Sequence, residues 1–471
     1  SETFALPKTL TFLEMCGVGR LEYLNIEKRW RENNPVTTLA VPVGVGTDGE
    51  LFYLDLHQKA QGPHGLVAGT TGSGKSEFLI TYILSLALNF HPDEVAFVLI
   101  DYKGGGLAGA FDDPVNGIEL PHLAGTITNL DGAAIARSLV SIQSEMKRRQ
   151  RVFNEAKSIA GEGTMDIYMY QRLYRNQVVA EPMPHLFIIS DEFAELKQQE
   201  PEFLDQLVSI ARIGRSLGVH LILATQKPSG VVTDQIVSNT KFRVCLKVQD
   251  RSDSMEMLKR PEAAELRETG RFYLQVGNNE LFALGQSAWS GAEYEPQDEV
   301  VVKKDGSVQV LDDTGDTILE VKPEVKKHGT GRSQLTEITR ELTRIAREHG
   351  ISQHLLWLPA LEKQIDRSRM EEEGAKTAPD ALLYTCCGLL DDPAAQKQYP
   401  MYLDYGKCGN ILVAGEPGCG KTTFIQTMLL SLAERYSPKQ VQFYILDYSS
   451  RMLRIFDGLP HCGGVLGEEQ E

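Results

Sequence analysis

"GTTGSGKS" occupies residues 69–76, and "GEPGCGKT" occupies residues 415–422. Both stretches fit the pattern G-x-x-x-x-G-K-S/T, whose glycines let consecutive backbone N–H groups surround phosphate oxygens at the start of a helix. In such a loop the lysine reaches the β- and γ-phosphates of a nucleotide, and the last hydroxyl is a ligand for Mg²⁺. Each stretch therefore predicts a site for ATP and Mg²⁺. The predicted loop residues are Gly69, Thr70, Thr71, Gly72, Ser73, Gly74, Lys75 and Ser76, then Gly415, Glu416, Pro417, Gly418, Cys419, Gly420, Lys421 and Thr422.

The surroundings of the two loops repeat in one register. Gly420 follows Gly74 by 346 residues (420 − 74 = 346), and Asp447 follows Asp101 by the same distance. The segments "HPDEVAFVLIDY" (91–102) and "SPKQVQFYILDY" (437–448) therefore lie equally far beyond their loops. A fixed period of this kind indicates two copies of one structural module.

Each copy reads as strand, loop, helix and strand. Residues 65–69 and 410–415 are short apolar runs that lead into the glycines. Residues 76–90 and 422–436 are apolar at helical spacing, whereas 95–101 and 441–447 are nearly continuous apolar runs typical of strands covered on both faces. Such units build α/β domains, so we expect a mostly parallel central sheet flanked by helices, in tandem.

Three polar residues follow further apolar strands of the first copy. In "HLFIISDEF" (185–193), Asp191 ends the strand and is suited to hold Mg²⁺ through water, and Glu192 can orient or deprotonate an attacking water. In "HLILATQKP" (220–228), Gln226 ends the next strand, where ligands bind in open α/β sheets. Gln226 is therefore a candidate γ-phosphate sensor, and the alternative is a glutamine that only caps a turn.

Two groups of basic residues are candidates for functional contacts. Arg212 and Arg215 precede the strand at 220–226, and phosphoryl transfer is often accelerated by an arginine from a neighbouring subunit. The alternative is that both arginines are solvated, as is common on helices. The segment "EMKRRQRVF" (145–153) places a basic run on an expected helix. That run is either a solvated helix face or a contact to substrate or an adjacent protomer.

The length of the chain and a charged, turn-rich segment predict how it divides into domains. A length of 471 residues suggests more than one domain. Residues 293–332 are charged and rich in turn formers, with two alternating pieces, "VVVKKDGSVQVL" and "TILEVK", that could pair as a hairpin. We expect a first module with a helical lead-in at 1–292, a linker or small hairpin at 293–332, and the incomplete front part of a second module at 333–471.

Charge and cysteine usage narrow the class of protein. The net charge of −16 argues against broad nucleic-acid binding, which needs clustered Lys and Arg. No apolar run approaches the ~18 residues that a membrane span needs, and the N-terminus lacks the layout of a signal peptide. The seven cysteines form no CxxC pair, so we expect reduced thiols without a metal or disulfide framework.

Five motifs occur in the order seen in FtsK/SpoIIIE-type ATPases, ring-forming motors with a RecA-like core. They are "GTTGSGKS", "FVLIDYKGGG", "SEMKRRQRVF", "FIISDEFAEL" and "SLGVHLILATQKPS". The resemblance covers about residues 35–290 and resumes in the second copy. Within that family the tandem arrangement and the lead-in resemble the coupling ATPases of type VII secretion systems, the EssC/EccC family.

The resemblance implies roles for individual residues. Lys75 and Ser76 match the phosphate-loop positions, Asp191 and Glu192 the acidic pair, and Gln226 the sensor. Arg215 lies in "RSLGVH" where DNA-translocating relatives carry an inter-subunit arginine finger in "RAAGIH". In the second copy Lys421 and Thr422 match, but "DYSSRML" replaces "DYKGGGL", so hydrolysis and binding without hydrolysis both stay open there.

The resemblance also implies a cellular role. It predicts the cytosolic part of a membrane-anchored, homo-oligomeric ring that couples ATP hydrolysis to export of small helical WXG100-type proteins and contacts other secretion subunits. One alternative is a double-stranded DNA translocase, which the net charge disfavours. Another is a nucleotide-binding scaffold with little turnover.

Overall fold

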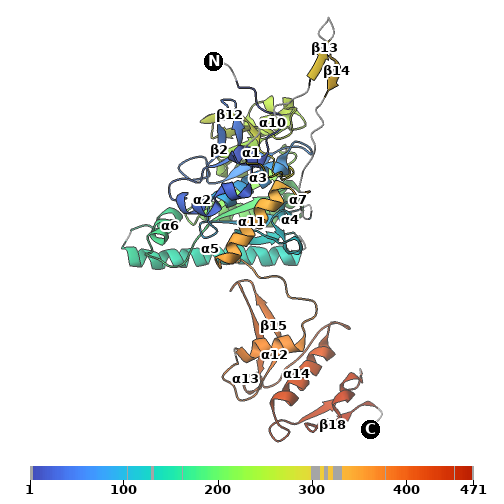
Figure 1. The fold of residues 1–471 in the computed structure, drawn as a ribbon. Coiled ribbons are helices and arrows are strands. Elements are labelled where there is room, and N and C mark those ends of the chain that lie inside the picture. Colours follow the sequence, from blue (N-terminus) through green and yellow to red (C-terminus); the bar gives the residue numbers. More distant parts are fainter. Residues whose placement is uncertain are drawn as a thin grey trace. The chain divides into compact units, whose positions relative to one another are not determined.

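The computed structural model describes residues 4–468 except 103, 105, 129–131, 162, 299–307, 312–316, 322–330, 377 and 450. The chain divides into two compact units, Ser1–Trp357 and Leu358–Glu471 (Figure 1). None of the described helices combines the length and the apolar composition that crossing a bilayer requires.

The first unit is built on a ten-stranded sheet, which confirms the predicted fold class. Its strand order is β2-β1-β12-β11-β10-β3-β9-β8-β4-β7. The strands from β10 to β7 run parallel, and the four at the other end pair antiparallel. The bounds are β1 Val41–Gly46, β2 Leu51–Leu54, β3 Gly65–Ala68, β4 Val95–Ile100, β7 Leu123–Ile127, β8 His185–Ser190, β9 Val219–Thr225, β10 Phe242–Cys245, β11 Arg271–Val276 and β12 Leu281–Ser287.

Helices cover both faces of this sheet. Alternate residues of β4 enter different cores: Phe97 belongs to the cluster that includes α3, and Val98 to the cluster that includes α5. This is why the strand reads as a continuous apolar run. The helices are α1 Phe12–Cys16, α2 Ile26–Glu32, α3 Lys75–Asn89, α4 Gly106–Gly109, α5 Gly132–Ala160, α6 Ile167–Arg175, α7 Phe193–Gln199, α8 Pro201–Ile213, α9 Asp234–Asn239, α10 Arg251–Leu258 and α11 Gln334–Glu348, with a short 3₁₀ turn, η3, at Glu262–Glu265.

The boundary between the units differs from the expected one. Helix α11, expected in the second module, packs on the first unit, where Ile338, Leu342 and Ile345 join the core that includes α3. An amphipathic helix predicts that one face is buried, but not which module buries it. Within the expected linker, β13 (Val308–Leu311) and β14 (Thr317–Val321) pair antiparallel, so the described part of 293–332 contains the predicted hairpin. The rest of the two pieces, at 300–307 and 322, and the segment 312–316 between them lie outside the described residues.

The second unit repeats the local structure that follows the first loop. Its elements are α12 Arg367–Lys376, β15 Tyr384–Asp392, β16 Lys397–Asp404, α13 Tyr405–Cys408, α14 Lys421–Arg435, β17 Phe443–Leu446, η4 Met452–Phe456 and β18 Cys462–Leu466. Strands β17 and β18 pair parallel, as β4 and β7 do in the first unit.

Equivalent hydrogen bonds recur in the two units. The carboxylate of Asp101 accepts from the Leu107 N–H at 3.0 Å, and that of Asp447 accepts from the Leu453 N–H at 3.1 Å. Both members of the second pair lie 346 positions after those of the first. A recurring contact between side chain and backbone shows that the sequence period is a structural period.

One predicted strand does not form. Residues 411–414 lead into the second loop but pair with no strand among the described residues, whereas their counterpart β3 lies between β9 and β10. Leu412 is 91% exposed, and the equivalent Leu66 is 1% exposed. A central strand needs neighbours on both sides, and in the first unit those neighbours come far later in the chain than the loop itself.

Buried histidines predict how the stability of the first unit depends on pH. Burial lowers the pKa of His64 to about 4, lowers those of His122 and His220 to about 3, and holds that of His185 well below its usual value. The folded state keeps these rings neutral, whereas the unfolded chain binds protons near its ordinary pKa of about 6.5. The stability they contribute is therefore present above that pH and is lost as the pH falls toward 4.

We expect the free energy of unfolding of the first unit to fall between pH 6.5 and 4, and His122→Gln to reduce that slope by about 1.4 kcal/mol per pH unit. Urea titrations followed by tryptophan fluorescence measure this, because all three tryptophans, Trp30, Trp289 and Trp357, lie in the first unit. Equal slopes in wild type and variant would contradict the assignment.

Candidate functional site

The first loop lies at the carboxyl ends of central parallel strands. Strand β3 leads into it, and α3 begins at Lys75. Gly72 and Gly74 adopt φ values of +82° and +91°, a left-handed conformation that favours glycine. The Gly69 N–H donates to the carbonyl of Thr225 at 3.1 Å, and the Thr70 N–H donates to that of Lys247 at 2.8 Å. The loop is therefore anchored to the ends of β9 and β10.

The structure brings Lys75 to the acidic pair. Lys75 is buried, and its Nζ donates to the backbone carbonyl of Asp191 at the end of β8. Ser76 is exposed in the first turn of α3. The phosphate-binding loop and the acidic pair therefore face one another across the end of β9, the strand between β3 and β8.

Asp191 lies beside a second carboxylate. Its Oδ1 accepts a hydrogen bond from the Tyr102 N–H at 3.0 Å. Burial raises the pKa of Asp191 to about 6, and the nearby Asp101 carboxylate adds to the rise. Asp101 itself is buried and accepts from the backbone of α4. Asp101 was not predicted as a site residue, although its position at the end of a buried apolar strand is the same signal that marks Asp191.

Glu192 is fixed to the end of β9. It is buried, its Oε1 accepts from the Thr225 hydroxyl at 2.7 Å, and its Oε2 accepts from the Gln226 N–H at 2.9 Å. The candidate catalytic carboxylate and the candidate sensor are therefore joined by a hydrogen bond. Thr225 was missed in the sequence, because a threonine inside an apolar strand gives no sign of its partner.

Arg215 lies at the amino-terminal ends of the parallel strands, whereas the phosphate-binding loop of the same unit lies at their carboxyl ends. It is exposed in the turn between α8 and β9, and the seven residues of β9 separate that turn from Gln226. At about 3.3 Å per residue the separation is roughly 20 Å. Arg212 is also exposed, in the last turn of α8. Neither arginine reaches the loop of its own unit, so either could act only on a neighbouring copy.

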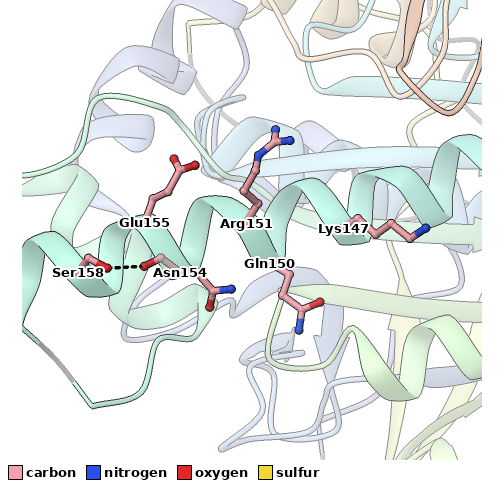
Figure 2. Close-up of a pocket in the computed structure, with 6 residues that line it drawn as sticks. All are labelled: Lys147, Gln150, Arg151, Asn154, Glu155 and Ser158. Atoms are coloured by element: carbon pink, nitrogen blue, oxygen red, sulfur yellow. Dashed lines mark hydrogen bonds between the residues drawn. The ribbon is translucent and has the colours of Figure 1, made fainter.

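The basic run at 145–153 was expected to be either a solvated helix face or a contact to substrate or an adjacent protomer. Two of its arginines are neither, because they bond within the unit. Arg149 is 1% exposed, donates to Glu145 at 3.0 Å, and donates to the carbonyl of Leu217 at 2.8 Å. Arg148 forms two further hydrogen bonds of 2.8 Å to Glu145. These arginines are internal supports of α5. The outer side of the helix, shown in Figure 2, forms a shallow polar depression lined by Lys147, Gln150, Arg151, Asn154, Glu155 and Ser158.

The second loop has a different arrangement. The Nζ of Lys421 donates to the carbonyls of Gly415 at 2.6 Å and Glu416 at 2.8 Å, so the lysine folds back on its own loop. Cys419 is exposed and Thr422 is partly buried.

Sheet topology, loop conformation and the opposed acidic pair define a P-loop nucleotide-binding protein with a RecA-like core. The profile of the FtsK/SpoIIIE family matches residues 22–230 and again 390–470, in agreement with two copies. The chain belongs to the FtsK/SpoIIIE family.

Several known proteins are similar to the chain over almost its whole length. Type VII secretion system protein EssC of Staphylococcus aureus strain Mu50 is 46% identical over 99% of this chain, and ESX secretion system protein YukB of Bacillus subtilis is 45% identical over 98%. The chain spans only 31% and 30% of these two relatives. The cytoplasmic domain of the type VII secretion ATPase EccC of Thermomonospora curvata matches 98% of the chain with a TM-score of 0.80 and 30% identity, and half of that domain is covered (50%).

Proposed function

We propose that the first unit binds and hydrolyses ATP as a motor module of a type VII protein secretion system. The observation that carries this proposal is the contact of Lys75 with the end of β8, which places the phosphate-binding loop opposite Asp191 and Glu192. Loop, lysine and acidic pair are the parts that phosphoryl transfer to water requires.

The residues present fit a bound Mg²⁺–ATP. Lys75 would bind the β- and γ-phosphates. The Ser76 hydroxyl would supply an oxygen ligand to Mg²⁺, and the Asp191 carboxylate would hold the ion through water, since Mg²⁺ bound to phosphates usually keeps several waters. The magnesium ion would neutralise charge on the phosphates.

Glu192 is the proposed general base. In this conformation both of its carboxylate oxygens accept hydrogen bonds from the end of β9. A carboxylate oxygen can accept two hydrogen bonds, so Oε2, which accepts from the Gln226 N–H, has a second lone pair for an attacking water. We propose that the side chain of Gln226 contacts the γ-phosphate. Arg215 of an adjacent copy would then complete the site.

The relatives support a proposal for the cellular role. EssC and YukB are secretion proteins by name, and this chain corresponds to about a third of their length. We propose that the chain is the cytoplasmic portion of a membrane-anchored ring, and that small helical WXG100-type proteins are its cargo. A DNA translocase is disfavoured by the net charge of −16.

Turnover should depend on assembly. We expect the chain alone to hydrolyse ATP slowly, and the same chain held in a ring by a fused oligomeric tag to hydrolyse it at least about tenfold faster, because an arginine in trans is worth orders of magnitude in such enzymes. Release of phosphate measures both rates, with and without duplex DNA. Absence of turnover in the ring would favour a scaffold, and stimulation by DNA would favour a translocase.

Arginine variants identify the trans residue in the same ring. We expect Arg215→Ala to remove the stimulation while nucleotide affinity stays at the wild-type value. Arg212→Ala is the matched control, since it lies a few residues away and is equally exposed. Equal effects of the two changes would contradict the role of Arg215.

A further inference from the structure

The segment before β11 contacts the backbone of the first phosphate-binding loop. The Thr269 hydroxyl donates to the carbonyl of Gly72 at 3.2 Å, and the Gly270 N–H donates to the carbonyl of Ser73 at 2.8 Å. Both acceptors lie in the turn that presents the loop N–H groups. The loop is thus held from outside its own strand and helix.

The approach of the two backbones is close. A Cβ atom at Gly74 would meet the Gly270 nitrogen at 2.8 Å, and a Cβ atom at Gly270 would meet Nε2 of Gln286 at 2.9 Å. Gly270 itself has a φ of +83°. Only glycine fits at either position, so the contact is a constraint of the fold and not an accidental proximity.

A chain of hydrogen bonds holds this segment in place. Gln286 is buried, and its Nε2 donates to the carbonyl of Thr269 at 2.9 Å. Its Oε1 accepts from Nε of Arg271 at 2.9 Å, and Arg271 in turn donates to the carbonyl of Pro7 at 3.0 Å. The loop is therefore connected through side chains to the segment that precedes α1.

We propose that Thr269 and Gly270 are positioning residues that keep the first loop in its phosphate-binding conformation, and that Gln286 and Arg271 maintain them. Phosphate binding uses N–H groups fixed in advance, so a loop that must be ordered at binding has a lower affinity. This inference rests on the proposed nucleotide site at Lys75.

The test replaces the Thr269 hydroxyl. All variants carry Lys421→Ala, so that only the first loop binds. We expect Thr269→Val to weaken the affinity for a fluorescent ATP analogue by about threefold to tenfold, the effect of one hydrogen bond, and Thr269→Ser to restore it. Thr164→Val is the matched control, because Thr164 is an exposed threonine away from the loop.

Hydrogen–deuterium exchange without nucleotide gives a second readout that does not depend on the proposed function. We expect amides 72–75 to exchange faster in Thr269→Val than in wild type or Thr269→Ser, with an unchanged unfolding midpoint. Failure of the wild type to bind the analogue would refute the nucleotide site and leave exchange as the test of the loop contact. Wild-type exchange in Thr269→Val, or wild-type affinity in a chain that binds, overturns the proposal.

Discussion

Glu192→Gln is expected to slow ATP hydrolysis by roughly 10²–10³-fold while nucleotide affinity stays within about twofold of wild type. The amide cannot accept a proton from water, but it nearly preserves the shape of the side chain. It can also keep an acceptor for the Thr225 hydroxyl or the Gln226 N–H, which hold the carboxylate in the present conformation. Single-turnover hydrolysis by the chain held in a ring by the fused oligomeric tag measures the rate, and equilibrium binding measures the nucleotide affinity.

The control for this experiment is a glutamate three residues further along the chain. Glu195→Gln changes the same functional group in the first turn of α7 and should leave hydrolysis within about twofold, because Glu195 makes none of the contacts that fix Glu192 at β9. Retention of hydrolysis in Glu192→Gln, or an equal loss in Glu195→Gln, would remove Glu192 from the role of general base.

Glu145→Gln is expected to destabilise the first unit by about 3 kcal/mol, because loss of one charge leaves a buried ion pair uncompensated. Glu145 and Arg149 are each 1% exposed and joined at 3.0 Å, with Arg148 on the same carboxylate. Burial alone would raise the pKa of Glu145, but hydrogen bonds from His354 and Arg148 and the charge of Arg149 hold it well below its usual value.

Glu155→Gln is the matched control, because it lies on the same helix on the exposed polar side shown in Figure 2. Its effect should stay within about 0.5 kcal/mol, as for most surface changes. Urea titration with tryptophan fluorescence reports on the first unit alone. Equal stabilities of the two variants would show that the buried carboxylate contributes no net stability.

The contribution of Glu145 to the free energy of unfolding requires the ionised carboxylate, so it should disappear as the pH falls below the ordinary glutamate pKa of about 4.5.

Parts of the site could be read directly from the chain. The phosphate-binding loop and the residues that end β8 were placed correctly because each belongs to one strand and the turn that follows it, and parallel strands bring their carboxyl ends to one edge. Lys75 and Asp191 meet at that edge in the structure. The expected homology of the two copies is equally local, since it rests on spacing alone.

Other features depended on contacts between distant segments. The basic run at 145–153 gave no sign that Arg149 is buried against the carbonyl of Leu217, and α11 was assigned to the wrong unit. The pairing of Thr225 with Glu192 joins residues from different strands. Charged and amphipathic patterns indicate that a side chain is paired or buried. They do not indicate which distant segment it contacts.

The amino-acid sequence by itself determined the class of fold, the positions of both loops and the strand ends that carry the acidic pair. These features arise from glycine conformations and from short, nearly continuous apolar runs, which each involve only a few consecutive residues. Only the tertiary structure decided that β3 is a central strand and that Thr269 and Gly270 hold its loop. Strand pairing and the hydrogen bonds that hold the loop join segments that are distant in the sequence. They form only when the chain folds, so they cannot be predicted from any single segment.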